Sequence, residues 1–147
     1  MGNKTQRTLI IMGYIYNPDG FDWMNYQISK ENPVSYHHIV EKRRNGTTTV
    51  ENGAILTDKS HDLLNILDQF CPQAYNDLQD VFIRINNSNE PPTNETVKEI
   101  DSILFNIFFT SKYYFREGSC EFDRDKLLSR HRERYLKSRK KLTKCLE

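Results

Sequence analysis

The spacing of apolar residues predicts strands in the first part of the chain and helices in the rest. Residues 8–16 (TLIIMGYIY) are apolar and partly β-branched, which predicts a strand. Residues 35–40 and 54–57 predict two short strands, and the polar, turn-rich residues 41–51 form a hairpin-like connection between them. From about residue 58 the apolar positions take helical spacing. The middle of the chain therefore reads strand, loop, strand, helix.

Three more helices are predicted in the second half. Pro72 suits the first residue of a helix, and the apolar face of that helix would consist of Ala74, Leu78, Val81, Phe82 and Ile85. Residues 86–94 (NNSNEPPTN) predict a loop, residues 97–108 an amphipathic helix that continues towards Tyr114, and residues 124–144 a basic helix. We therefore expect an α+β fold with an N-terminal strand region and C-terminal α-helices. Residues 1–120 would form one domain with a helical extension at 72–116, and residues 121–147 a basic C-terminal helix.

Composition narrows the class of protein. The chain has 147 residues, 37% of them hydrophobic, and no run of about 20 apolar residues that could span a membrane. We expect a globular, cytoplasmic protein. Cys71, Cys120 and Cys145 are odd in number and form no CxxC pair, which argues against a disulfide framework and against a structural zinc site. Cys71 is expected to be buried and inert.

The charges are unevenly distributed. Residues 1–120 carry 11 Lys or Arg against 15 Asp or Glu, whereas residues 121–147 carry 10 against 5. A basic tail is consistent with a polyanionic partner, and equally with a solvated helix face. His131, between two arginines of this tail, is predicted to lie at the surface. The aromatic cluster at residues 21–26 is predicted to pack in the core or in a lid rather than to stack on bases.

Three of the four histidines fall within residues 36–65. His37 and His38 are adjacent on a predicted strand, so their side chains point to opposite faces, and one could hold an ion while the other acts as a base. That division suits phosphodiester hydrolysis, in which a metal binds the phosphate and a base activates water. His61 begins the following helix, and Asn65 lies one turn later on the same face. Taken singly, each has a structural explanation, such as imidazoles bonded to backbone carbonyls.

The order His37-His38-Ile39, Asn52, Leu56, His61 resembles the HNH endonuclease family, also called ββα-metal or His-Me finger nucleases. The resemblance implies a ββα-metal core at about residues 35–70. It implies that His37 and His61 bind the metal, that His38 is the general base, and that Asn52 orients the base by bonding across the loop. Asn65 falls where some members carry a further His ligand. Many members have a Pro where this chain has Glu41, and many carry zinc-binding CxxC pairs that brace the motif. Here the N-terminal region and the later helices would brace it instead.

The implied activity is metal-dependent hydrolysis of phosphodiester bonds in DNA. One divalent ion is expected, Mg²⁺ by the resemblance, with Mn²⁺, Ni²⁺ or Zn²⁺ as alternatives because imidazoles suit them better. The expected partner is a nucleic acid, DNA in preference to RNA, held by the basic residues Lys42, Arg43, Arg44, Arg130, Arg134, Lys137 and Lys140. A ribonuclease of the same chemistry is a weaker alternative, because the sequence does not distinguish DNA from RNA. One alternative is an HNH-like module of a phage or mobile element that binds nucleic acid, a protein partner or a second copy without cleavage. Another is a helical regulator that binds through its basic C-terminal helix.

Overall fold

The protein is an α+β fold with five α-helices and one two-stranded antiparallel sheet among its described residues. The computed structural model describes residues 3–16, 20–116 and 124–146, and only the backbone of residues 3–5, 13–16, 124 and 142–146. The elements are, in order, α1 (Asn3–Tyr16), β1 (Val34–His38), the 3-10 helices η1 (Lys42–Arg44) and η2 (Val50–Asn52), β2 (Gly53–Thr57), α2 (Asp58–Phe70), α3 (Pro72–Ser88), α4 (Asn94–Phe109) and α5 (Arg124–Leu146). None of the described helices is both long and apolar enough to cross a membrane.

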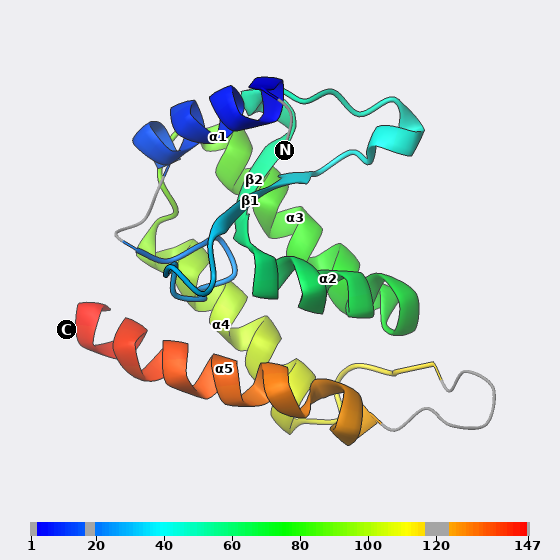
Figure 1. Cartoon of the computed structure of the whole chain (residues 1–147). Coiled ribbons are helices and arrows are strands. Elements are labelled where there is room, and N and C mark those ends of the chain that lie inside the picture. Colours follow the sequence, from blue (N-terminus) through cyan, green and yellow to red (C-terminus); the bar gives the residue numbers. More distant parts are fainter. Residues whose placement is uncertain (1–2, 17–19, 117–123, 147) are drawn as a thin grey trace.

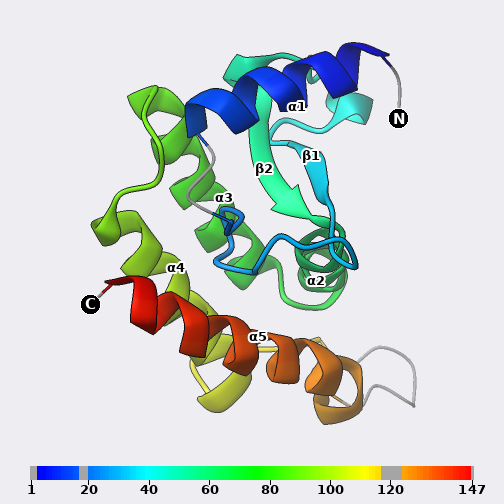
Figure 2. The same ribbon diagram turned by 60° about the vertical axis from the view of Figure 1, so that its left-hand side comes forward.

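The sheet lies between the first helix and the later ones (Figure 1). Helix α1 packs against β1, β2 and η2, and α2 and α3 contact β2 as well. Helix α4 packs on α3, and α5 lies across α4 and contacts α2, as both ribbon views show (Figure 2). The strands and helices predicted at 35–40, 54–57 and from residue 58 are confirmed as β1, β2 and α2, with β1 shifted by one to two residues.

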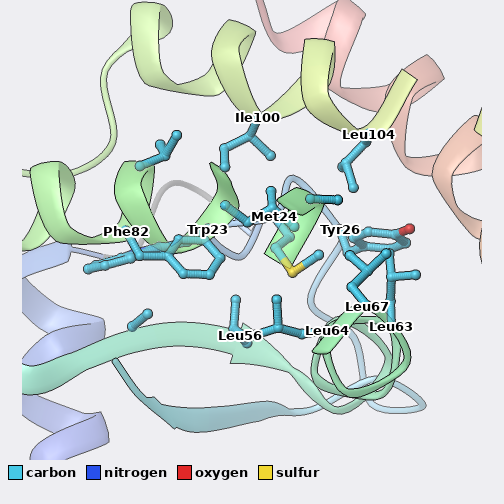
Figure 3. Close-up of a cluster of buried hydrophobic side chains, with 14 of the residues drawn as sticks. Trp23, Met24, Tyr26, Leu56, Leu63, Leu64, Leu67, Phe82, Ile100 and Leu104 are labelled. Carbon is cyan, nitrogen blue, oxygen red and sulfur yellow. The ribbon is translucent and has the colours of Figure 1, made fainter. Parts of the chain in front are cut away.

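The segment that joins α1 to β1 contributes large buried side chains to the core. Trp23 and Met24 are fully buried, and Figure 3 shows them between Leu56 of β2 and Ile100 of α4. Trp23 also contacts the ring of Phe82, with centroids 6.3 Å apart. The prediction that this aromatic cluster packs in the core is confirmed. Cys71 is fully buried too, as expected.

The strand predicted at residues 8–16 was wrong, because these residues belong to helix α1. Thr8, Leu9 and Met12 are buried, whereas Ile10 and Ile11 are 65% and 48% exposed. Burial at i, i+1 and i+4 is helical periodicity, while a strand would bury alternate residues. β-Branched composition is a weak signal that tertiary packing overrides, and β1 and β2 pair with each other rather than with a third described strand.

Two helix ends also differ from prediction. Helix α3 runs through Asn86 to Ser88, because the Asn86 amide donates to the carbonyls of Val50 and Gly53, both at 2.7 Å, and so holds this turn against the loop. Helix α4 stops at Phe109 instead of running to Tyr114. The chain turns back there because the Tyr113 hydroxyl donates to the Asp77 carboxylate at 2.7 Å.

His131 was predicted at the surface and is in fact buried, with 3% of its area exposed. It lies on the face of α5 that also carries Leu128 and Tyr135, both buried, since residues at i, i+3 and i+7 share one side of a helix. Its Nε2 is 3.1 Å from the Asp62 carboxylate of α2. A histidine between two arginines therefore forms part of the interface between α5 and α2.

Candidate functional site

The succession β1, β2, α2 brings the predicted site residues to one pocket. His37 pairs with Ala54 and His38 with Gly53 across the antiparallel ladder. The Thr57 hydroxyl caps α2 by accepting from the Ser60 amide, so the helix begins directly after β2 and its first turns lie beside β1. The pocket has a volume of about 290 Å³ and is lined by His37, His38, Glu41, Lys42, Arg43, His61, Asn65, Asp68 and Tyr75.

His37 forms the buried wall of this pocket, with 6% of its area exposed. Its Nε2 lies 2.7 Å from Oε1 of Gln79 on α3, and its ring meets the Phe82 ring edge to face at 5.9 Å. The pKa of His37 is lowered to about 4, mainly by burial and also by the nearby His61, while the hydrogen bond to Gln79 acts in the opposite direction. His37 is therefore a neutral imidazole at neutral pH, which is the form that binds metals.

His61 faces His37 from α2. The two ring centroids are 5.4 Å apart and the rings are nearly perpendicular, at 89°. The Nδ1 atom of His61 is 3.3 Å from the Ser35 hydroxyl on β1. Burial lowers the pKa of His61, and Asp58 partly offsets that effect. The site thus contains two adjacent neutral imidazoles held from different elements.

His38 is partly exposed and bonds elsewhere. Its Nε2 lies 2.9 Å from the Thr48 hydroxyl, and its ring meets Tyr36 edge to face at 4.6 Å. Burial, followed by the charge of Lys42, lowers the pKa of His38. His37 and His38 therefore contact different elements, as the alternation of a strand predicts. Both nevertheless line the same pocket, at the end of β1 where the strand gives way to the loop.

Asn52 closes the base of the loop between the strands. Its Oδ1 accepts from the Val40 amide at 2.8 Å, and its Nδ2 donates to the carbonyls of Val40 and Thr47 at 3.0 and 2.8 Å. Its own carbonyl accepts from the Ile39 amide at 2.9 Å. Asn52 thus bonds across the loop, and it fixes the backbone immediately after His38 rather than the imidazole itself.

The donor set is chemically suited to a divalent ion. Asn65 is exposed, one turn after His61, and lines the pocket. Bonds of about 2.1 Å would leave each ring centroid roughly 3.2 Å from a shared ion, a reach compatible with the 5.4 Å between the centroids of His37 and His61. The described residues contain no group of three or more His, Cys, Asp or Glu placed to hold a metal. The predicted set has two histidines, and its third member is an amide.

The basic residues predicted to bind nucleic acid fall into two separate groups. Lys42, Arg43 and Arg44 form η1, and the first two line the pocket. Arg43 is ion-paired with Glu41. The other four predicted residues, Arg130, Arg134, Lys137 and Lys140, belong to α5. None of these four α5 residues lines the pocket, so of the two groups only that of η1 adjoins His37, His38 and His61.

Sequence reasoning missed the residues that hold the imidazoles. Gln79, Thr48 and Ser35 each bond to a different histidine. Ser35 stands two residues before His37 on the same strand, a spacing that places both on one face and could have identified it. Gln79 is 42 residues from His37, and only the packing of α3 against the hairpin brings the two together.

Comparison with known proteins does not assign the chain to a family. No protein-family model, no curated protein sequence and no solved structure matches the chain.

Proposed function

We propose that the protein is a metal-dependent endonuclease of the HNH type that hydrolyses phosphodiester bonds in DNA, with residues 35–70 as its ββα-metal core. The main support for the proposal is that one pocket is lined by His37, His38, His61 and Asn65. These residues come from the first of two antiparallel strands and from the helix that directly follows the second. The alternative structural explanations treat each histidine singly, and they give no reason for all three to line one pocket.

In this proposal each residue has one task. His37, His61 and Asn65 would hold a divalent ion, which would supply Lewis-acid stabilisation of charge on the phosphate. His38 accepts a proton from the attacking water, a role for which its lowered pKa leaves it neutral at neutral pH. Asn52 keeps the loop closed after His38. Lys42 and Arg43, at the pocket, contact the phosphates on either side of the scissile bond.

The test is nicking of a supercoiled plasmid in the presence of Mg²⁺, Mn²⁺, Ni²⁺ or Zn²⁺, with an EDTA control. Wild-type protein should nick with at least one ion. His38→Ala should lose cleavage by roughly 100-fold or more, the usual contribution of a general base, and should keep its fold and its DNA affinity. Nicking by His38→Ala at the wild-type rate would refute the assignment of the base.

A second candidate is a module with the same fold that binds nucleic acid or a protein without cleaving. Asn65 favours it, because an amide stands where a third imidazole would strengthen metal binding, and the described residues contain no three-membered ligand group. This candidate predicts DNA binding in a mobility-shift assay, no nicking with any ion, and no effect of His38→Ala. If instead binding depends on α5, replacing its exposed Arg130, Lys137 and Lys140 by Gln should abolish it, while His38→Ala leaves it unchanged.

A further inference from the structure

Gln79, on α3, bonds to two parts of the pocket at once. Its Nε2 donates to the Ile39 carbonyl at 2.8 Å, directly after the histidine doublet. Since a carbonyl can only accept, this bond fixes the orientation of the amide and leaves Oε1 facing His37. That oxygen lies 2.7 Å from His37 Nε2. Because the amide oxygen can only accept, His37 Nε2 must carry the proton.

The tautomer of His37 follows from this bond. A neutral imidazole with its proton on Nε2 has its lone pair on Nδ1. None of the residues described by the structure forms a hydrogen bond to that Nδ1 atom. The His37 ring meets the His61 ring at a centroid distance of 5.4 Å, and both residues line the pocket. The Nδ1 atom is therefore the nitrogen of His37 that remains for a ligand.

We propose that Gln79 is a positioning residue for metal binding, which holds His37 with Nε2–H directed at α3 and with Nδ1 presented to the ion. This inference rests on the proposed function, and it concerns a residue outside the ββα segment. Metal-bound histidines commonly donate their second N–H to a fixed acceptor, which orients the ring and increases its basicity. Phe82, one turn further along α3, contacts the same ring, but an apolar contact cannot select between tautomers.

Two substitutions separate the bond to His37 from the bond to Ile39. Gln79→Met has a similar length and apolar stem and removes both bonds. Gln79→Glu keeps an acceptor for His37 and loses the donor to Ile39. The matched control is Gln73→Met, because Gln73 is exposed on the first turns of the same helix. Urea unfolding of all three variants measures how much each change affects folding.

The readout is ¹⁵N NMR of the histidine side chains together with titration by Zn²⁺, which is diamagnetic and suits imidazole ligands. In the wild type we expect a protonated His37 Nε2 that keeps its proton when Zn²⁺ is added, while the Nδ1 resonance shifts. Gln79→Met should lose the hydrogen-bonded Nε2–H signal and bind Zn²⁺ about 10- to 100-fold more weakly. Gln79→Glu should retain the signal and bind at least as tightly as the wild type, and Gln73→Met should match the wild type.

Three results would overturn the inference. Loss of the Nε2 proton on Zn²⁺ binding would mean that the wrong nitrogen has been assigned. Unchanged Zn²⁺ affinity in folded Gln79→Met would mean that Gln79 has only a structural role, with the proposed nuclease function left intact. Absence of Zn²⁺ binding at His37 in the wild type would remove both this inference and the metal site of the proposed function.

Discussion

Asp22 is the buried carboxylate on which the position of α2 depends. One oxygen accepts from the backbone amides of Met24 and Tyr26, both at 2.9 Å. The other accepts from the Thr57 amide at 2.7 Å, from the Thr57 hydroxyl at 2.8 Å and from the Ser60 hydroxyl. Only 1% of Asp22 is exposed. These five bonds tie the segment after α1 to the junction of β2 and α2, three residues before the candidate ligand His61.

Asp22→Asn should destabilise the fold because one backbone N–H group, that of Thr57, loses its hydrogen-bond acceptor. The two hydroxyls can rotate and accept from the new amide nitrogen, but the Thr57 N–H has no such freedom and loses its acceptor. An unsatisfied buried donor costs about 1–3 kcal/mol, so the free energy of unfolding should fall by that amount. Burial raises the pKa of Asp22, and its hydrogen bonds act in the opposite direction. The expected loss of stability does not depend on that balance, because either oxygen of a carboxyl group can accept and an amide nitrogen cannot.

Asp22→Ala removes all five acceptor contacts and should cost more, about 3–5 kcal/mol, as expected for the loss of a buried hydrogen-bond network. Equilibrium urea unfolding followed by circular dichroism measures both variants. Asp80→Asn is the matched control, since Asp80 is exposed on α3, and its effect should stay within about 0.5 kcal/mol. An Asp22→Asn variant as stable as the wild type or more stable would contradict this prediction, because the buried charge would then cost more than its hydrogen bonds contribute.

The contacts of Gly53, Asn52 and His131 can each be tested by a single substitution. Gly53→Ala would place a Cβ 2.5 Å from Cε2 of Tyr36, so the free energy of unfolding should drop by about 1–3 kcal/mol, and an unchanged urea midpoint would contradict this. Asn52→Ala should accelerate hydrogen exchange at the Val40 amide, which loses its bond to Oδ1, while exchange in α4 should not change. Burial, and then Arg134, lower the pKa of His131; its contribution to stability is therefore present above the unfolded pKa of about 6.5 and is lost as the pH falls through the folded pKa. His131→Gln should lose less stability than the wild type between pH 7.5 and pH 5, as measured by urea unfolding, and equal losses would show that His131 does not cause the dependence.

The parts of the fold that could be predicted from the sequence are those set by local spacing. The strand, loop, strand, helix order follows from apolar runs and turn residues, and α3 follows from five apolar positions on one helical face, all of which are buried. The gathering of His37, His38, His61 and Asn65 at one pocket follows from the same order, because a helix that starts directly after a hairpin lies beside it. These features depend on neighbours within about 30 residues.

One missed feature depends on contacts between distant segments, and another was visible in the local spacing. Residues 8–16 form a helix because Leu9 and Met12 pack under the hairpin, and composition alone could not reveal that. The burial of His131 could have been predicted, since its spacing from Leu128 and Tyr135 places it on the apolar face of α5. Its charged neighbours in the sequence concealed that face.

Helix α3 explains how a hairpin without zinc-binding cysteine pairs is held in place. Gln79 and Asn86 are seven residues apart, and both lie on the side of α3 that faces the hairpin. Gln79 bonds to His37 and to the Ile39 carbonyl at the start of the loop, and Asn86 bonds to the carbonyls of Val50 and Gly53 at its end. Two amides on one rigid helix therefore fix both ends of the loop that contains Thr48 and η1.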